Sequence, residues 1–287
     1  MKAVSENVAL PHLLRLLDDE QPEVRNVVHS QLANYDGDLS NEVAGLGIDL
    51  SEKDRSVLSR LLMSGRRRSL RAQWFAPPAA LCSPDGDWDL FEAFLRMLSD
   101  YLHDGVSLRP SLSDLLDELA DESAERHIDD PIPLANWLFD NNKFKANRDD
   151  YYNPSNSDLA EVIMRGEGIP LSLSLVFILV AQRRQIPVFG CNYPGHFLCW
   201  TDTSSGPLVI DPYNQARTLA VKNVLATNAN ISSSKLNALQ SPARQIDMLR
   251  RIIANLNHAF VKQNAPDDAA LMDELSESLD EVELANI

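Results

Sequence analysis

The sequence predicts an α+β fold in which helices predominate and a buried helix packs on a small antiparallel sheet. Apolar residues recur at intervals of three and four, the period of an amphipathic helix, over much of residues 10–135 and again over residues 245–282. Between these regions, three short stretches within residues 188–210 have the composition of strands and are separated by turn residues.

Composition and charge limit the kinds of partner that we expect. The chain has 287 residues and 44% hydrophobic content, which is enough for an ordinary buried core. Its net charge of −16 opposes broad binding to nucleic acid or to an anionic membrane, because both are polyanions. We therefore expect no nucleic-acid partner and no membrane partner, and the charge favours basic or neutral partners.

The cysteine content and the apolar runs indicate a cytoplasmic protein. Cys82, Cys191 and Cys199 are too few and too irregularly spaced for a disulfide framework, which favours a reducing compartment. Residues 1–6 lack a basic region followed by an apolar stretch, so no signal peptide is expected. The longest apolar run, residues 171–181, is well short of the roughly 20 residues that a membrane span needs.

Helices are expected throughout residues 1–135. Residues 10–34 resemble one helical hairpin of a HEAT-type repeat, with Pro22 in the first turn of its second helix, but no second copy follows at the same period. Residues 51–76 then keep helical spacing up to a Pro-Pro pair. Residues 88–98 and 112–119 form two further amphipathic stretches, whose aromatic stripe is interpreted as core rather than as the lining of a ligand groove.

A loop is expected before the central region of the chain, and two helices are expected after it. Residues 139–156 are rich in Asn, Asp, Lys and Tyr without periodicity, which predicts a long ordered loop or a domain join. Residues 245–260 have helical spacing, and a helix with an acidic outer face follows Pro266. That face is interpreted as a solvated surface, with docking of a basic partner as the alternative.

The central helix is expected to start at Pro170. Asp158 and Glu161 are spaced like a capping box before a short helix that closes at Gly166. The apolar run that starts at Pro170 is longer than a usual strand, so a helix with Pro in its first turn is favoured. The first turn of a buried helix stabilises a thiolate or an oxyanion. That first turn offers only the hydroxyl of Ser172. Ser174 follows about 200 degrees further around the axis, so at most one of the two faces a given site.

A hairpin is expected to bring His196 and Asp211 together. Strands are predicted at residues 188–191, 196–201 and 208–210, with turn residues 202–206 between the last two. If the hairpin is centred between residues 203 and 204, His196 lies opposite Asp211, and directly opposite residues have Cβ atoms about 5 Å apart. The carboxylate would then orient the imidazole as in a catalytic triad, although a purely structural His–Asp pair is the alternative.

A metal site in the same region is not expected. Cys191, His196 and Cys199 are close in sequence, but Cys199 is three residues from His196 and so points to the other face of a strand. A fourth ligand is also missing, and buried thiols explain both cysteines better. We therefore predict no metal and no cofactor.

Four motifs in order carry a family resemblance. They are YYNPSNS at 151–157, GIPLSLS at 168–174, NYPGHFL at 192–198 and IDPYN at 210–214. Residues 136–256, which contain them, resemble the bacterial SirB family of the transglutaminase-like superfamily, whose core is related to papain-type cysteine proteases. The resemblance implies an N-terminal helical region at 1–135, a transglutaminase-like core at 136–222 and a C-terminal helical region at 223–287.

The resemblance also implies roles for individual residues. Active members of the superfamily use Cys, His and Asp in that order, with the Cys at a helix N-terminus, and His196 and Asp211 match the second and third positions. Ser172 lies where the Cys would fall, as in other SirB proteins. The residues expected to line or support the groove are Asn156, Pro170, Ser174, Tyr193, Gly195 and Asn214.

Three functions are compatible with this pattern. We favour a pseudoenzyme that lacks the nucleophilic Cys and binds a peptide or protein segment in the groove between Ser172 and His196. The alternative is an amide or acyl-ester hydrolase, or an acyltransferase, that uses a Ser172–His196–Asp211 triad. The second alternative is a structural scaffold, in which the His and Asp are replaceable.

Overall fold

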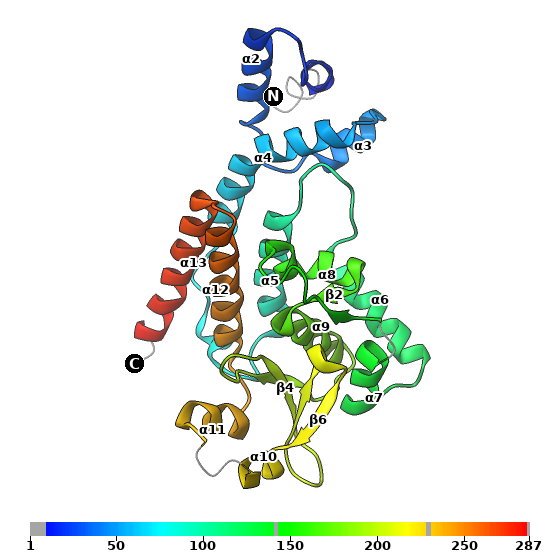
Figure 1. The fold of residues 1–287 in the computed structure, drawn as a ribbon, viewed down its shortest axis with the longest axis vertical. Coiled ribbons are helices and arrows are strands. Elements are labelled where there is room, and N and C mark those ends of the chain that lie inside the picture. The colour runs from blue at the N-terminus through cyan, green and yellow to red at the C-terminus, as the bar shows by residue number, and fades with distance from the viewer. Residues whose placement is uncertain (1–9, 141–142, 228–230, 286–287) are drawn as a thin grey trace. The chain divides into compact units, whose positions relative to one another are not determined.

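The computed structural model describes residues 10–140, 143–227 and 231–285 and confirms the α+β fold, with many helices and a small antiparallel sheet (Figure 1). Contacts divide the chain into two compact units. The first consists of Met1–Trp74 with Asp100–Arg109, and the second of Phe75–Ser99 with Pro110–Ile287. The three ranges implied by the family resemblance, 1–135, 136–222 and 223–287, stay a prediction about where the transglutaminase-like core begins and ends.

The first unit is helical. Residues 10–15 are helical and precede α2 (Pro22–Leu32), α3 (Ser40–Leu46) and α4 (Glu52–Gln73). Pro22 begins α2, where a missing N–H costs nothing, as the sequence predicts. The apolar faces of the helical residues meet in one core, which consists of Leu10, Leu13, Leu14, Leu17, Val28, Leu32, Leu39, Val43, Leu50, Leu58, Leu62 and Val106.

The sheet of the second unit is a four-stranded antiparallel meander in the order β3–β4–β5–β6. Its strands are Phe189–Cys191, Leu198–Thr201, Leu208–Asp211 and Arg217–Ala220. The first three lie where the sequence predicts strands. The fourth was not predicted, because it is an edge strand whose residues are mostly exposed and do not alternate between apolar and polar.

The helix α9 (Pro170–Arg183) is the centre of the second unit (Figure 1). Residues 170–181 are all buried, as expected of a helix that is hydrophobic on every side. It contacts β3 and β4 on the sheet, and helices α6 (Leu112–Glu125), α7 (Pro131–Ala135) and α8 (Leu159–Arg165) elsewhere. A buried helix on a small sheet therefore forms as predicted.

The opposite face of the sheet is covered as well. Cys191, Leu198 and Val209 pack with residues of α10 (Val221–Thr227) and α11 (Ser233–Gln240). Trp200 Nε1 donates a hydrogen bond of 3.3 Å to the carbonyl of Leu239 in α11. The sheet is thus sandwiched between α9 and these two short helices.

The remaining helices of the second unit are long and amphipathic. They are α5 (Trp88–Leu102), whose last residues enter the first unit, α12 (Gln245–Lys262) and α13 (Pro266–Ala285). Helices α12 and α13 pack along each other as a hairpin (Figure 1). The short helix η1 (Ala79–Cys82) contacts α12.

Residues 139–156 are more structured than expected. They include the end of a π-helical turn, η2 (Asn136–Asp140), the strand β1 (Lys145–Ala146) and the start of η3 (Pro154–Ser157). The strand β1 pairs in parallel with β2 (Glu167–Gly168), directly before α9. A strand of two residues is too short to leave a periodic signal in the sequence.

The predicted register of the central hairpin is wrong by two residues. The ladder pairs Cys199 with Ile210 and Thr201 with Leu208, so His196 is not opposite Asp211 and precedes the strand. The turn accounts for the shift, because Gly206 N donates to the Thr203 carbonyl at 2.9 Å and takes a φ of +101°. A four-residue turn at 203–206 moves the centre of the hairpin one residue further along the chain.

Candidate active site

A Pro-Gly turn sets the position of His196. The backbone N–H of His196 donates to the carbonyl of Tyr193 at 3.2 Å, which closes a turn across Pro194 and Gly195. Gly195 has a φ of +81°, which fits the third position of a type II turn, and Pro194 suits the second. The turn therefore presents His196 just before β4 begins.

The imidazole of His196 contacts the carboxylate of Asp211 at the end of β5. Nε2 lies 2.9 Å from Oδ2, and the two side chains are 29% and 14% exposed. The contact has the length but not the alignment of a hydrogen bond, since Nε2 has no well-aligned partner among the described residues. The ring of Tyr213 approaches the imidazole edge-on, with centroids 5.9 Å apart.

Asn214 holds the Asp211 carboxylate in place. Its backbone N–H donates to Oδ1 at 3.2 Å and its side-chain amide donates to Oδ2 at 2.8 Å. Burial on its own raises the pKa of Asp211, but the contacts with His196 and Asn214 outweigh it and hold the pKa below its usual value of 3.8. Asp211 is therefore ionised at neutral pH and suited to orient the imidazole.

Ser172 does not join this pair. Its hydroxyl accepts a hydrogen bond from the backbone N–H of Ile169 at 3.0 Å and donates one to the Ile169 carbonyl at 3.2 Å. This is half of a capping box, in which the side chain of the third helical residue accepts a hydrogen bond from the backbone N–H of the residue that precedes the helix. Ser172 is 1% exposed, and a Cβ at Gly168 would lie 2.7 Å from its Oγ. The hydroxyl is thus enclosed and satisfied within the start of α9, where Pro170 is the first residue.

Ser174 and the two cysteines nearby are buried as well. The Ser174 hydroxyl has no hydrogen-bond partner among the residues that the structure describes. Burial raises the pKa of Cys191 to about 12 and raises the pKa of Cys199 as well, and both are fully buried. Thiols of this kind are inert at neutral pH, because only the thiolate attacks.

Asn156 organises the loop beside the pair. It is fully buried, and its side-chain amide donates to the carbonyls of Asp150 and Tyr151 at 2.7 Å and 3.1 Å. Its Oδ1 accepts from the side chain of Asn147 at 2.9 Å. The carbonyl of Asn147 in turn accepts from the hydroxyl of Tyr213 at 3.2 Å. Asn156 therefore supports, through the loop, the ring that contacts His196.

Arg251 supports the His196 turn from α12 and was not predicted from the sequence. Its guanidinium donates to Asn192 Oδ1 at 2.6 Å and to the Tyr193 carbonyl at 3.1 Å. It also lies over the ring of Phe197, 5.3 Å from the centroid. No local signal marks this residue, because it is far from the turn in sequence and its helix has an ordinary amphipathic pattern.

A cavity of about 380 Å³ is lined by Tyr213 and Asn214, which contact His196 and Asp211 respectively. Its other walls include Phe139, Phe144, Ala146 and Arg148. Ala146 forms no ladder hydrogen bond to β2, because the bonds of this parallel pair run through Lys145 and Asn147. Its backbone N–H and carbonyl therefore face away from β2.

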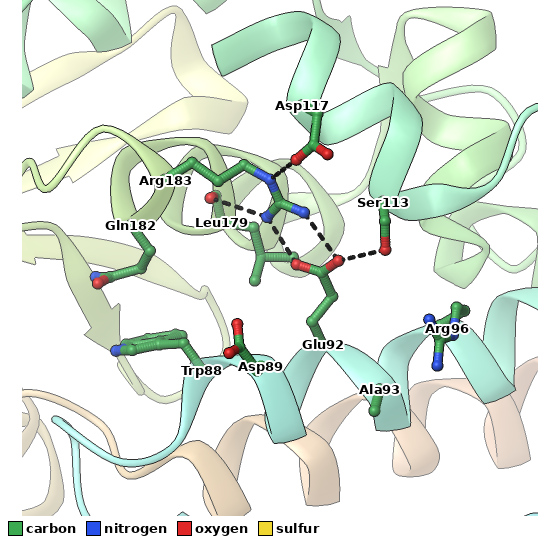
Figure 2. A pocket seen from close by; sticks show the side chains of 10 residues that line it. All are labelled: Trp88, Asp89, Glu92, Ala93, Arg96, Ser113, Asp117, Leu179, Gln182 and Arg183. Carbon is green, nitrogen blue, oxygen red and sulfur yellow. Dashed lines mark hydrogen bonds and ion pairs between the residues drawn. The ribbon is translucent and has the colours of Figure 1, made fainter. Parts of the chain in front are cut away.

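A second cavity, of about 440 Å³, lies near the other end of α9 (Figure 2). At its centre Arg183 forms a two-pronged ion pair with Glu92, with contacts of 2.7 Å and 2.9 Å, and a further contact of 2.6 Å with Asp117. Ser113 donates to Glu92 as well. These charges satisfy one another and join α5, α6 and α9, so we assign this network a structural role.

Among the described residues, no three His, Cys, Asp or Glu side chains are grouped in a way that could hold a metal ion. No described helix has both the length and the apolar character needed to cross a membrane.

Part of the chain matches a known protein family. Residues 108–254, just over half of the chain, match the family described as the transglutaminase-like superfamily. The chain belongs to the transglutaminase-like superfamily. The matched residues include α9, the whole sheet and the His196–Asp211 pair. This confirms the superfamily that the motifs predict.

Relatives of this transglutaminase-like chain match only parts of it. It is 34% identical over 149 residues to a UPF0162 protein of Xylella fastidiosa (strain 9a5c), which covers 49% of this chain and 53% of that protein. It is 32% identical over 127 residues to F-box only protein 21 of Homo sapiens, which covers 42% of this chain and 20% of that protein. The alignment thus spans about half the length of the bacterial relative. No solved structure matches the chain.

Proposed function

We propose that this transglutaminase-like chain is a SirB-type protein that binds a peptide or protein segment beside His196 and performs no covalent catalysis. The observation that carries the proposal is the engagement of Ser172. Its hydroxyl both accepts from and donates to the backbone of Ile169, so it is committed to the start of α9. A serine can act as a nucleophile only when a base removes its proton, and neither hydrogen bond goes to His196.

The surroundings of the His196–Asp211 pair support the binding of a peptide. His196 is partly exposed, is presented by a rigid turn and is oriented by an ionised Asp211. Tyr213 and Asn214, which contact the pair, also line the cavity, and Ala146 of β1 lies on its wall. A strand edge beside a side-chain pocket is a common way to hold an extended peptide. The F-box only protein relatives also favour a protein partner.

The alternative, a hydrolase or acyltransferase with a Ser172–His196–Asp211 triad, requires the Ser172 hydroxyl to leave Ile169. This would expose a buried backbone N–H without its partner, at a cost of about 1–3 kcal/mol. A structural scaffold is the remaining alternative, and it predicts that substitution of His196 changes neither binding nor chemistry.

Selection from a library of random 12-residue peptides displayed on phage tests the proposal. We expect the wild-type chain and Ser172→Ala to enrich the same peptides, and His196→Ala to lose them while keeping its circular dichroism spectrum. Ser172→Ala is the matched control because it removes the only hydroxyl of the triad alternative. Enrichment that is unchanged by His196→Ala, or absent with the wild type, would contradict the proposal.

A further inference from the structure

Four cations around the His196 turn pack on aromatic rings. Arg148 lies 4.9 Å from the ring centroid of Tyr213, and Lys235 lies 5.5 Å from that of Tyr193. The other two pairs are Arg251 over Phe197 at 5.3 Å and Lys262 over Tyr152 at 5.6 Å. We call Arg148, Lys235, Arg251 and Lys262 the cation rim. Such cation–π contacts leave the charge of the cation uncompensated.

None of the four rim cations forms an ion pair with a carboxylate in the part of the chain that the structure describes. Arg148 donates to the amide oxygen of Asn214, at 3.2 Å, and Arg251 donates only to neutral oxygens. Some other cations of the same unit are paired with acids: Arg183 with Glu92, Arg184 with Asp129, Arg244 with Asp247 and Lys145 with Glu167. In a chain with a net charge of −16, these four cations bring positive charge together around one turn.

Direct contacts join the rim to the His196–Asp211 pair. Tyr213, which carries Arg148, contacts the imidazole, and Tyr193 closes the turn that precedes it. Tyr151 packs edge-on against Tyr152, with centroids 5.4 Å apart, and interacts electrostatically with Tyr213 and Arg251. The rim, its rings and the pair therefore make up one continuous region of the second unit.

Arg148 is the rim cation best placed to bind a ligand. It is exposed and lines the 380 Å³ cavity together with Phe139, Phe144 and Tyr213. The acids of its own loop do not neutralise it, because Asp150 accepts from Asn153 and Asp149 forms no ion pair within the described residues. A carboxylate that approached Arg148 would find a guanidinium that, among the described residues, hydrogen-bonds only to a neutral amide.

These observations favour an acidic peptide over a nucleic acid. Aromatic rings with cations also bind single-stranded nucleic acid, but such binding needs a groove with a positive potential along several phosphates. The net charge of −16 opposes a long polyanion, whereas a short segment interacts with the rim alone.

We propose that the cation rim recognises an acidic peptide segment, with a carboxylate on Arg148 and an adjacent apolar or aromatic side chain in the cavity. The inference rests on the proposed function and specifies the chemistry of the partner. It differs from the expectation drawn from overall charge, which favours basic or neutral partners. The net charge of the whole chain describes the average charge of its surface, and the charge at the rim differs from that average.

Fluorescence anisotropy with four labelled probes tests this. The probes are twelve-residue peptides with alternating Glu and Tyr, Gln and Tyr, or Lys and Tyr, and a twelve-residue oligo(dT). We expect the Glu-Tyr peptide to bind the full chain most tightly, and Arg148→Gln to weaken it about tenfold, which corresponds to the loss of one charge-assisted contact of about 1.4 kcal/mol. Arg148→Lys should retain most of the affinity.

The control is Arg96→Gln, which removes an exposed arginine from α5 in the same unit and should leave binding unchanged. If the Gln-Tyr or Lys-Tyr peptide binds as tightly, or if Arg148→Gln binds like the wild type, the inference is wrong but the proposed function stands. Tighter binding of oligo(dT) overturns the inference in favour of nucleic acid. If no peptide binds and the phage selection also enriches none, the proposed function itself fails.

Discussion

His196 and Asp211 are 2.9 Å apart, between Nε2 and Oδ2, although they do not face each other in the sheet. The ladder pairs Cys199 with Ile210, so the strand position opposite Asp211 falls two residues after His196. The imidazole reaches the carboxylate from the turn that precedes β4. The contact thus depends on the turn at Pro194 and Gly195 as much as on the sheet.

Replacing the carboxylate should reveal a pH-dependent contribution to stability. The folded-state pKa of Asp211 is held below 3.8, so its contribution is present above that value and is lost as the pH falls through the folded pKa. We expect Asp211→Asn to lower the free energy of unfolding by about 1–2 kcal/mol at pH 7. Urea unfolding from pH 7 to pH 3 measures this, and the difference from the wild type should shrink below about pH 4. A difference that grows on acidification would contradict the assignment.

Removing the Ser172 hydroxyl should destabilise the chain without affecting a bound peptide. Ser172→Ala leaves the buried N–H of Ile169 without an acceptor, which costs about 1–3 kcal/mol. Thermal unfolding should show the loss. Ser172→Thr, which keeps a hydroxyl, is the matched variant if its extra methyl group is accommodated, and equal stability of Ser172→Ala and the wild type would count against the capping role.

Only one of the three thiols should react in the folded protein. Cys82 is partly exposed, whereas Cys191 and Cys199 are fully buried and the pKa of Cys191 is raised to about 12. We expect iodoacetamide at pH 7.5 to modify Cys82 alone, and all three cysteines to react in guanidinium chloride, as mapped by peptide mass spectrometry. Rapid modification of Cys191 in the native state would make it a candidate nucleophile and would contradict our account of the site.

The turn at Gly195 should tolerate Asn better than Ala. A Cβ at this position meets no atom within 4 Å, so the cost of substitution is the φ of +81°. Asn adopts left-handed backbone more readily than Ala, which loses about 1 kcal/mol or more there. We expect the order of stability Gly195, Gly195→Asn, Gly195→Ala in thermal unfolding. Equal stability of the two variants would mean that the turn relaxes.

The network in the second cavity should matter for stability but not for binding. Glu92 and Arg183 are 14% and 20% exposed, so Glu92→Gln leaves a largely buried arginine with weaker partners and should cost about 2–3 kcal/mol. Asp117 also contacts Arg183 but is 64% exposed, and Asp117→Asn should cost less than about 1 kcal/mol. Peptide affinity measured at a temperature where both variants are folded should equal that of the wild type.

The start of α9 could be predicted because its signals are local. Pro170 in the first turn, the capping pair at Asp158 and Glu161, and the glycine that closes α8 each act within a few residues. The pairing of His196 with Asp211 was also anticipated, but for an incomplete reason, since the turn ends at Gly206 and shifts the ladder. The turn residues 202–206 are compatible with several positions for the centre of the hairpin. The glycine that adopts a left-handed backbone conformation fixes which of these positions the turn takes.

The parts that could not be predicted depend on residues far apart in the chain. Arg251 supports a turn about sixty positions before it, and Arg148 packs on Tyr213 at a similar separation. Nothing near either arginine distinguishes it from a solvated side chain. The engagement of Ser172 with Ile169 was likewise not predicted, although a hydroxyl three residues after a helix cap is a known partner for the cap N–H.

Labelling with a fluorophosphonate probe, which forms a covalent adduct with activated serines, tests the central claim most directly. The probe is incubated with the full chain, and with an active serine hydrolase as a positive control, and the adducts are located by mass spectrometry. We expect the hydrolase to be labelled and Ser172 to remain unmodified. A stoichiometric adduct on Ser172 that disappears in His196→Ala would contradict the account, because it would show that the pair activates this serine.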